Sequence, residues 1–294
     1  MFDIINLSLS VVTFFLYLSI LTSSGTVICI LLFKLTDAKK IVILFGYLGL
    51  ISSIFGFALK GANLTGDLYG MIDKDILMLL WTTPIGTSFS YQIFGLLFII
   101  LGSYIRAYGG WISIFGSIAA IYSFIQIGHL ADKNNILLSI ILIMHLISVA
   151  FWIGILLPLK KLLKTPPRHI EAVEVGQKFG TLAIYFIPIL TLAGIIMSYS
   201  IVGSFSALIY TKYGQPLLLT LAFFVIVLAL GSTNKLLLLP PFTHHNPPSR
   251  VRLLNFIHLD SFFILLLLLF TTILPHPITL PLHHLSLIPL SAPT

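Results

Sequence analysis

Charged residues are scarce in this chain of 294 residues. Asp, Glu, Lys and Arg together make up 9% of it, 58% of the residues are hydrophobic, and the mean hydropathy is +1.08. A water-soluble domain needs a polar exterior that this composition cannot supply. The scarcity of charge therefore excludes a soluble fold and predicts an integral membrane protein.

Cysteine is nearly absent too, as are the local motifs of several enzyme classes. Cys29 is the only cysteine, which excludes an intramolecular disulfide and any metal or redox motif that needs a cysteine pair. The sequence contains no phosphate-binding glycine loop, no Ser-His-Asp arrangement and no dinucleotide-binding glycine motif. The net charge of +7 comes from short basic clusters between apolar runs, so we expect no nucleic-acid partner.

What the chain does contain is a series of apolar runs, each long enough to cross a bilayer. The N-terminus lacks the basic segment and cleavage site of a secretory signal, so we expect the first run to be retained as a helix. The predicted fold is all-α, a polytopic membrane bundle of about eight transmembrane helices in one domain, residues 1–274. The predicted spans are 6–33, 41–60, 88–106, 109–129, 136–159, 179–203, 215–236 and 253–274.

The connections between the predicted spans are alternately rich and poor in Lys and Arg. One set of connections holds 12 of the 16 Lys and Arg residues, including the run from Lys160 to Lys178, whereas the other set holds Lys60, Lys74, Lys133 and Lys212. By the positive-inside rule the richer set faces the cytoplasm. With eight spans, both termini then lie on the outer side of the membrane.

Three segments outside the spans have distinct compositions. Residues 61–87 include a short apolar segment, Ile76 to Trp81, which is either a re-entrant or interfacial helix or part of a plain loop. Residues 160–178 are rich in charge and are interpreted as a solvated linker. The tail, residues 275–294, has too many prolines for another regular helix and is predicted to be an outer arm.

The histidines of this tail form a candidate metal site at the surface, with an incidental role as the alternative. They are His276, His283 and His284.

The stretch from Met144 to Lys161 carries the main candidate residue. His145 lies within an apolar run, and an ionisable residue in a membrane is costly and tends to face a partner or a pathway. Because His145, Ser148 and Trp152 are spaced i, i+3 and i+7, they share one helix face. The alternative is a hydrogen-bonded structural histidine, whose partner would come from another helix, an ion or water.

Further polar residues suggest a path rather than a single site. Gln126 and His129 belong to a stripe at the outer end of the fourth span, and His145 is predicted to lie about 13 Å deeper than His129. Two ligands of one metal each lie about 2 Å from it, so these histidines are interpreted as successive stations. Met197 is predicted at nearly the depth of His145 and suits Cu(I), with plain packing as the alternative.

Several segments between about 125 and 275 resemble the copper resistance protein D family of bacterial inner-membrane proteins. Asn234 lies in one of these segments, and Asp260 stands where the family usually has Glu. Upstream, Phe89 and Gln92 occupy positions where the family tends to carry Trp and Arg. The similar segments are Gly128 and His129, His145 and Leu146, Phe151 to Gly154, Leu157 and Pro158, Phe179 and Gly180, Tyr213 to Pro240, and Leu274 and Pro275.

The resemblance implies copper movement or copper tolerance at the cytoplasmic membrane. We therefore expect an integral membrane protein, not an enzyme, that passes copper along His and Met side chains. A periplasmic copper carrier and other membrane subunits are the expected partners beside the lipid bilayer. One alternative is a haem or quinone oxidoreductase subunit with His129 and His145 as haem ligands, and another is a structural subunit of a larger complex.

Overall fold

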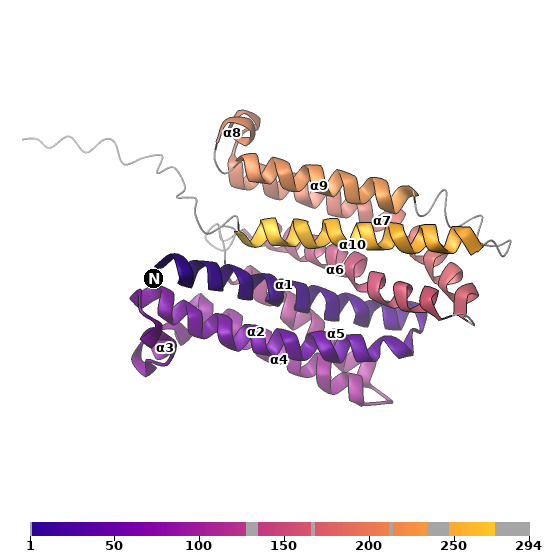
Figure 1. Ribbon diagram of the computed structural model, residues 1–294. Helices are drawn as coiled ribbons and strands as arrows, with labels where there is room; N and C mark the ends of the chain where they lie inside the picture. The colour runs from indigo at the N-terminus through magenta and orange to yellow at the C-terminus, as the bar shows by residue number, and fades with distance from the viewer. Residues whose placement is uncertain (1, 128–134, 166–167, 212–213, 234–246, 274–294) are drawn as a thin grey trace, which may run out of the picture.

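The computed structural model describes residues 2–127, 135–165, 168–211, 214–233 and 247–273 (Figure 1). These residues are helical, without a strand among them, which confirms the predicted all-α fold. The α-helices are α1 (Phe2–Phe33), α2 (Lys39–Thr65), α3 (Lys74–Trp81), α4 (Pro84–Tyr104), α5 (Gly109–Tyr122), α6 (Ile136–Lys164), α7 (His169–Val202), α8 (Phe205–Tyr210), α9 (Gly214–Thr233) and α10 (Pro247–Ile273). Short 3-10 helices are η1 (Thr36–Ala38), η2 (Leu68–Met71) and η3 (Ser123–Ile125).

Each of the eight predicted spans corresponds to a helix. Within the described residues, six helices are long and apolar enough to cross a membrane, namely α1, α2, α4, α6, α7 and α10. The apolar helices at Gly109–Ile125 and Leu217–Thr233 are shorter. Both coincide with predicted spans, so hydropathy located every long helix of the bundle.

The long helices run side by side, and α1 lies at the centre of the bundle (Figure 1). It packs against α2, α5, α6 and α10, and so joins the first half of the chain to the second. The start of α1 and the end of α10 lie at the same end of the bundle. This agrees with an even number of crossings. α6 packs mainly against α1 and α7 and has few contacts with α5, the helix that precedes it.

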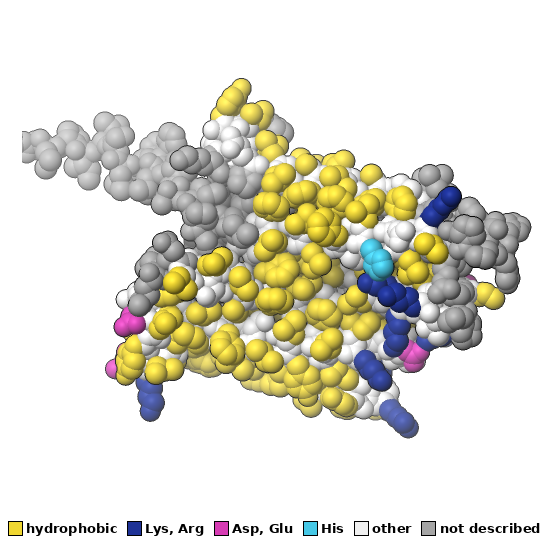
Figure 2. All heavy atoms as spheres, viewed as in Figure 1, with side chains coloured by type: hydrophobic (Ala, Val, Ile, Leu, Met, Phe, Trp, Pro, Cys, Tyr) yellow, Lys and Arg dark blue, Asp and Glu magenta, His cyan; other side chains and the backbone are white. Residues whose placement is uncertain are grey.

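The surface divides into a broad apolar belt and two charged ends (Figure 2). Large apolar side chains such as Leu44, Phe94, Trp111 and Tyr185 are more than half exposed. Lys and Arg side chains gather at the end that carries the α1–α2 and α6–α7 connections. An apolar belt bounded by polar ends is the surface expected of a protein surrounded by lipid.

The contact between α1 and α6 is unusually close. A Cβ atom added at Gly25 would lie 1.7 Å from the carbonyl oxygen of Ala150, and one added at Gly154 would lie 2.1 Å from the carbonyl carbon of Gly25. The Thr26 hydroxyl donates a hydrogen bond of 3.2 Å to the Gly154 carbonyl. Small residues allow helix backbones to approach in this way, and dispersion contacts then stabilise the pair.

One connection differs from its prediction, and another contains the helix that one of its two alternatives predicted. Residues 160–178 are not a linker, because α6 continues to Lys164 and α7 begins at His169. Residues 61–87 contain the short helix α3, whose N-terminus is capped by Asp73: its carboxylate accepts from the backbone N–H groups of Asp75 and Ile76. The helix alternative for 61–87 is therefore correct. The predicted outer arm, 275–294, lies outside the described residues.

Candidate functional site

The His145 side chain points from α6 toward α7. Its Nδ1 atom lies 3.3 Å from the carbonyl oxygen of Leu190. Since a carbonyl can only accept, this hydrogen bond requires the proton on Nδ1 and leaves the Nε2 lone pair available. Metal-binding histidines commonly have this arrangement, in which one ring nitrogen donates to a carbonyl and the other binds the ion.

Ser148 does not supply the partner of His145, because its hydroxyl donates to the Met144 carbonyl at 2.8 Å. The partner instead comes from another helix, which was one of the predicted sources. The bond to Leu190 by itself would also suit the structural alternative for His145.

The ring of His145 also lies against the backbone of α7. A Cβ atom added at Gly194 would lie 3.6 Å from Cε1 of His145, an ordinary van der Waals distance, so the imidazole packs directly against this part of α7. Leu190, Gly194 and Met197 are spaced i, i+4 and i+7 and share one face of α7. Met197 is half-buried and lies one turn beyond Gly194 on that face.

Trp152 lies two turns further along α6 and joins three other helices. Its indole Nε1–H donates a hydrogen bond of 3.3 Å to Oδ2 of Asp260 on α10. The ring meets Phe179 of α7 edge-on, with 6.4 Å between ring centroids. A Cβ atom at Gly231 of α9 would lie 2.9 Å from Cζ2 of Trp152. Trp152 is therefore held at a fixed position where α6, α7, α9 and α10 meet.

A cavity of about 260 Å³ lies beside Trp152 and Asp260. Side chains from α6, α7, α9 and α10 line it, and most of them are apolar. On α7 the lining runs from Gly176 to Ile187, about 16 Å at 1.5 Å per residue. Gly176, Gly180 and Gly231 contribute no side chain to the lining, and this leaves part of the open volume.

The cavity and His145 are aligned along one face of α7. Ile187, at one end of the lining, is three residues from Leu190, which accepts the hydrogen bond of His145. Residues spaced by three or four positions form a continuous helix face. This face consists of Gly176, Gly180, Ala183, Ile187, Leu190, Gly194 and Met197.

A second polar cluster, which sequence reasoning missed, lies in the first half of the bundle. Ser53 donates to Oε1 of Gln92 at 2.6 Å, and Gln92 donates through Nε2 to the Ser88 hydroxyl at 3.1 Å. Ser88 in turn donates to the carbonyl of Ser123 at 2.9 Å. The i, i+4 spacing of Ser88 and Gln92 was visible in the sequence, but Ser53 and Ser123 join them only through packing.

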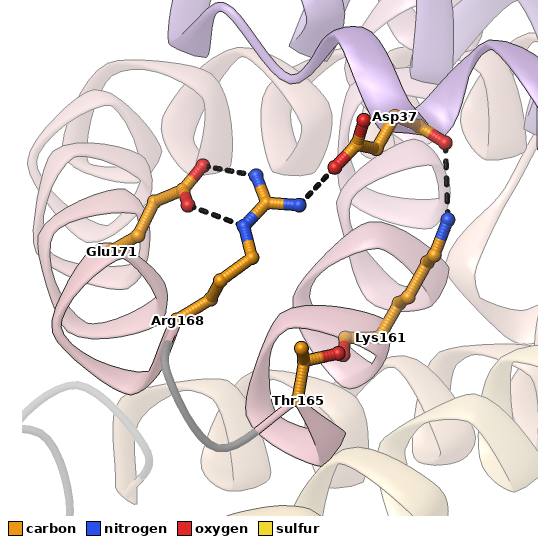
Figure 3. Close-up of polar contacts among 5 residues, drawn as sticks. All are labelled: Asp37, Lys161, Thr165, Arg168 and Glu171. Carbon is orange, nitrogen blue, oxygen red and sulfur yellow. Dashed lines mark hydrogen bonds and ion pairs between the residues drawn. The ribbon is translucent and has the colours of Figure 1, made fainter.

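The cytoplasmic-facing end, by the charge rule, carries an ion-pair cluster (Figure 3). Arg168 makes two hydrogen bonds of 2.7 Å to the carboxylate of Glu171 and pairs with Asp37. Lys161 donates to the backbone carbonyl of Asp37 at 3.2 Å. Hydrogen bonds to Glu171 and then Asp37 raise the pKa of Arg168 above its ordinary value. The cluster fastens the α1–α2 connection to the α6–α7 connection.

Of the remaining predicted site residues, the structure describes only Gln126. Gln126 follows η3, and because α5 ends at Tyr122 the expected α-helical stripe through Gln126 is interrupted. Within the part of the chain that the structure describes, there is no group of three His, Cys, Asp or Glu side chains that could hold a metal ion. Other predicted residues lie outside the described ranges: His129, Asn234, His276, His283 and His284.

Two family models match the chain, and both describe copper resistance protein D. Residues 1–137 match the model for the copper resistance protein D-like N-terminal domain, and residues 173–274 match the model for copper resistance protein D. The two regions together cover well over half of the chain. The chain belongs to the copper resistance protein D family. Together with its apolar helices, this makes it a multi-pass protein of the cytoplasmic membrane.

The family regions contain most of the cavity but not its α6 side. Asp260, Phe179 and Gly231 lie within the second matched region, while His145 and Trp152 lie in the segment between the two regions. A protein of Bacillus subtilis (strain 168) named copper transport protein CutJ is 30% identical over 115 residues. That alignment covers 37% of this chain and 21% of the relative. No solved structure matches the chain.

Proposed function

We propose that this member of the copper resistance protein D family moves copper ions across the cytoplasmic membrane along the α6-facing side of α7. The observation that carries the proposal is the position of His145. Its Nδ1 is engaged by the Leu190 carbonyl, its Nε2 is available, and the cavity begins one turn further along α7. A copper transport protein as a relative supports the choice of ion.

The side chains of this path suit Cu(I). Imidazole and thioether groups favour this soft ion, whereas carboxylates favour harder ions. Met197 and His145 would form the outer stations, with His129 and the tail histidines His276, His283 and His284 as further contacts nearer the outer surface. Below His145 the ion would enter the cavity beside Trp152. We propose movement from the outer face inward, with an outer copper carrier as the donor.

The test compares copper bound to the purified wild-type protein and to a His145→Ala variant in detergent. We expect the variant to bind copper at least about tenfold more weakly, because a ligand is lost. His258→Ala is the matched control, since His258 is exposed on α10 and is expected to leave binding unchanged. Reconstituted vesicles with an internal Cu(I) chelator would show whether passage falls in parallel.

A structural role for His145 gives a different result. Removal of the ring would then leave the Leu190 carbonyl without this partner, at a typical cost of about 1 to 3 kcal/mol. Protein level and copper binding would fall together. His129→Ala should have a milder effect if the histidines are successive stations. Equal loss of bound copper from both variants would instead mean one shared site.

A further inference from the structure

Asp260 is a carboxyl group within a membrane-spanning helix that has an incomplete set of partners. It is 2% exposed. Oδ2 accepts the hydrogen bond from Trp152, but Oδ1 has no hydrogen-bond partner among the residues the structure describes. A carboxylate taken out of water without a cationic partner is costly, and such groups in membranes commonly have a function.

No described basic side chain forms an ion pair with Asp260, because the ion pairs of the described residues all involve Arg168. The described part of α9 contains no titratable residue at all. Lys161 is engaged by Asp37, and Lys178 is exposed. The other titratable side chains that the structure describes on the helices around Asp260 are His145, Lys160 and Lys164 on α6, Glu171, Glu174, Tyr185 and Tyr199 on α7, Arg252 and His258 on α10, and Tyr17 and Cys29 on α1.

The cavity connects Asp260 toward the inner ends of the helices. Its lining includes Gly176 and Leu253, which lie about 10 Å from the first residues of α7 and α10 at 1.5 Å per residue. A water molecule occupies about 30 Å³ in the liquid, so a volume of about 260 Å³ has room for several. The cavity thus has room for water beside the carboxyl group, and it extends from Asp260 toward the end that the charge rule places inside.

We propose that Asp260 is a proton-binding site, and that proton uptake and release there is coupled to the passage of copper. A hydronium ion in the cavity would transfer its proton to Oδ1, forming an O–H bond and leaving a water molecule. Oδ2 would keep accepting from Trp152 throughout. Release reverses the step, and no electron is exchanged. The coupling rests on the proposed function, whereas the proton site itself does not.

Two measurements separate these statements. Infrared difference spectra of the full-length protein in lipid, recorded from acidic to alkaline pH, should show the carboxylic C=O band of a protonated Asp that disappears as pH rises. The band should be missing in Asp260→Asn, return at a shifted position in Asp260→Glu, and persist in Asp75→Asn. Asp75 is an exposed residue of α3 and serves as the control.

In vesicles containing a pH-sensitive dye, copper passage through the wild type should move protons.

The coupling predicts that Asp260→Asn lowers the number of protons moved per copper ion at least tenfold. An unchanged proton-to-copper ratio in this variant would overturn the coupling. A titrating band that persists in Asp260→Asn, or no titrating band in the wild type, would overturn the proton site. If the wild-type band titrates but no copper crosses, the proposed copper passage fails while the proton site stands.

Discussion

The indole N–H of Trp152 and the carboxylate of Asp260 form a buried hydrogen bond that joins α6 to α10 across 108 residues of sequence. Among the described residues, Trp152 is the side chain that donates a hydrogen bond to the Asp260 carboxylate. Both residues line the cavity. Trp152 therefore both holds the carboxyl group in place and closes one side of the open volume.

Trp152→Phe should destabilise the protein by about 1 to 3 kcal/mol, because Asp260 would lose its hydrogen bond while staying buried. The aromatic contact with Phe179 is largely kept in this variant. The matched control is Trp111→Phe, since Trp111 is 76% exposed. Thermal unfolding in detergent measures the difference. Adding Asp260→Asn should reduce the cost of Trp152→Phe, and equal melting of both Trp variants would contradict the argument.

Gly25→Ala should prevent normal packing of α1 against α6. The added methyl group would lie 1.7 Å from the Ala150 carbonyl oxygen, so one backbone must move. Gly56→Ala is the control, because the nearest atom to its added Cβ is a methyl carbon of Val12 at an ordinary 3.5 Å. Size-exclusion chromatography of the two variants should show a loss of monodisperse protein for Gly25→Ala only. Equal yields would argue against the close approach.

Arg168→Ala should have a small effect on stability, because both Arg168 and Asp37 are partly exposed. Exposed ion pairs typically contribute about 0.2 to 1 kcal/mol. A raised pKa means that this contribution is fully present below the ordinary pKa of arginine and is lost only as pH rises through the still higher folded value. It should therefore be constant across the physiological range. A double-mutant cycle with Asp37→Asn, at low and high salt, measures the coupling; a value that varies between pH 6 and 8 would contradict this reasoning.

Topology can be tested independently of metal. Reporter fusions should place residues 34–40, 160–178 and 235–252 on the cytoplasmic side and both termini outside, as the distribution of 12 and 4 basic residues predicts. A reporter after Lys164 that is active outside the cell would overturn this orientation.

The tail should be dispensable for folding. Its prolines exclude a further regular helix, so a chain that ends after Leu274 should still insert and remain monodisperse. Loss of membrane insertion in this truncation would show that the segment contributes to the bundle.

Local patterns predicted the helices well and their contacts poorly. Hydropathy located a helix at each of the eight predicted spans, six of which are long and apolar enough to cross a membrane. The i, i+7 spacing correctly oriented His145 and Trp152 toward one side of α6, where both contact α7. The seam at Gly25 and Gly154, the Gln92 cluster and the Arg168 cluster each join residues far apart in sequence. Periodicity within one segment carries no information on which distant helix lies opposite, so these contacts could not be predicted.

The predicted linker at residues 160–178 was wrong because contacts with a distant part of the chain were again not visible in the sequence. Lys160, Lys161 and Lys164 suggested a linker because charge runs are usually solvated, but a helix can continue beyond the membrane with its charged side chains in water. Here contacts with the α1–α2 connection stabilise that extension.

The tight seam between α1 and α6 also bears on how the protein is made. During synthesis α1 enters the membrane long before α6, and until then the Gly25 backbone, the Thr26 hydroxyl and the Cys29 thiol have no matching surface. Domains fold in order as the chain emerges, and incomplete intermediates are vulnerable. A nascent chain that stops after α5 therefore lacks the helix that covers Gly25, Thr26 and Cys29 in the complete bundle.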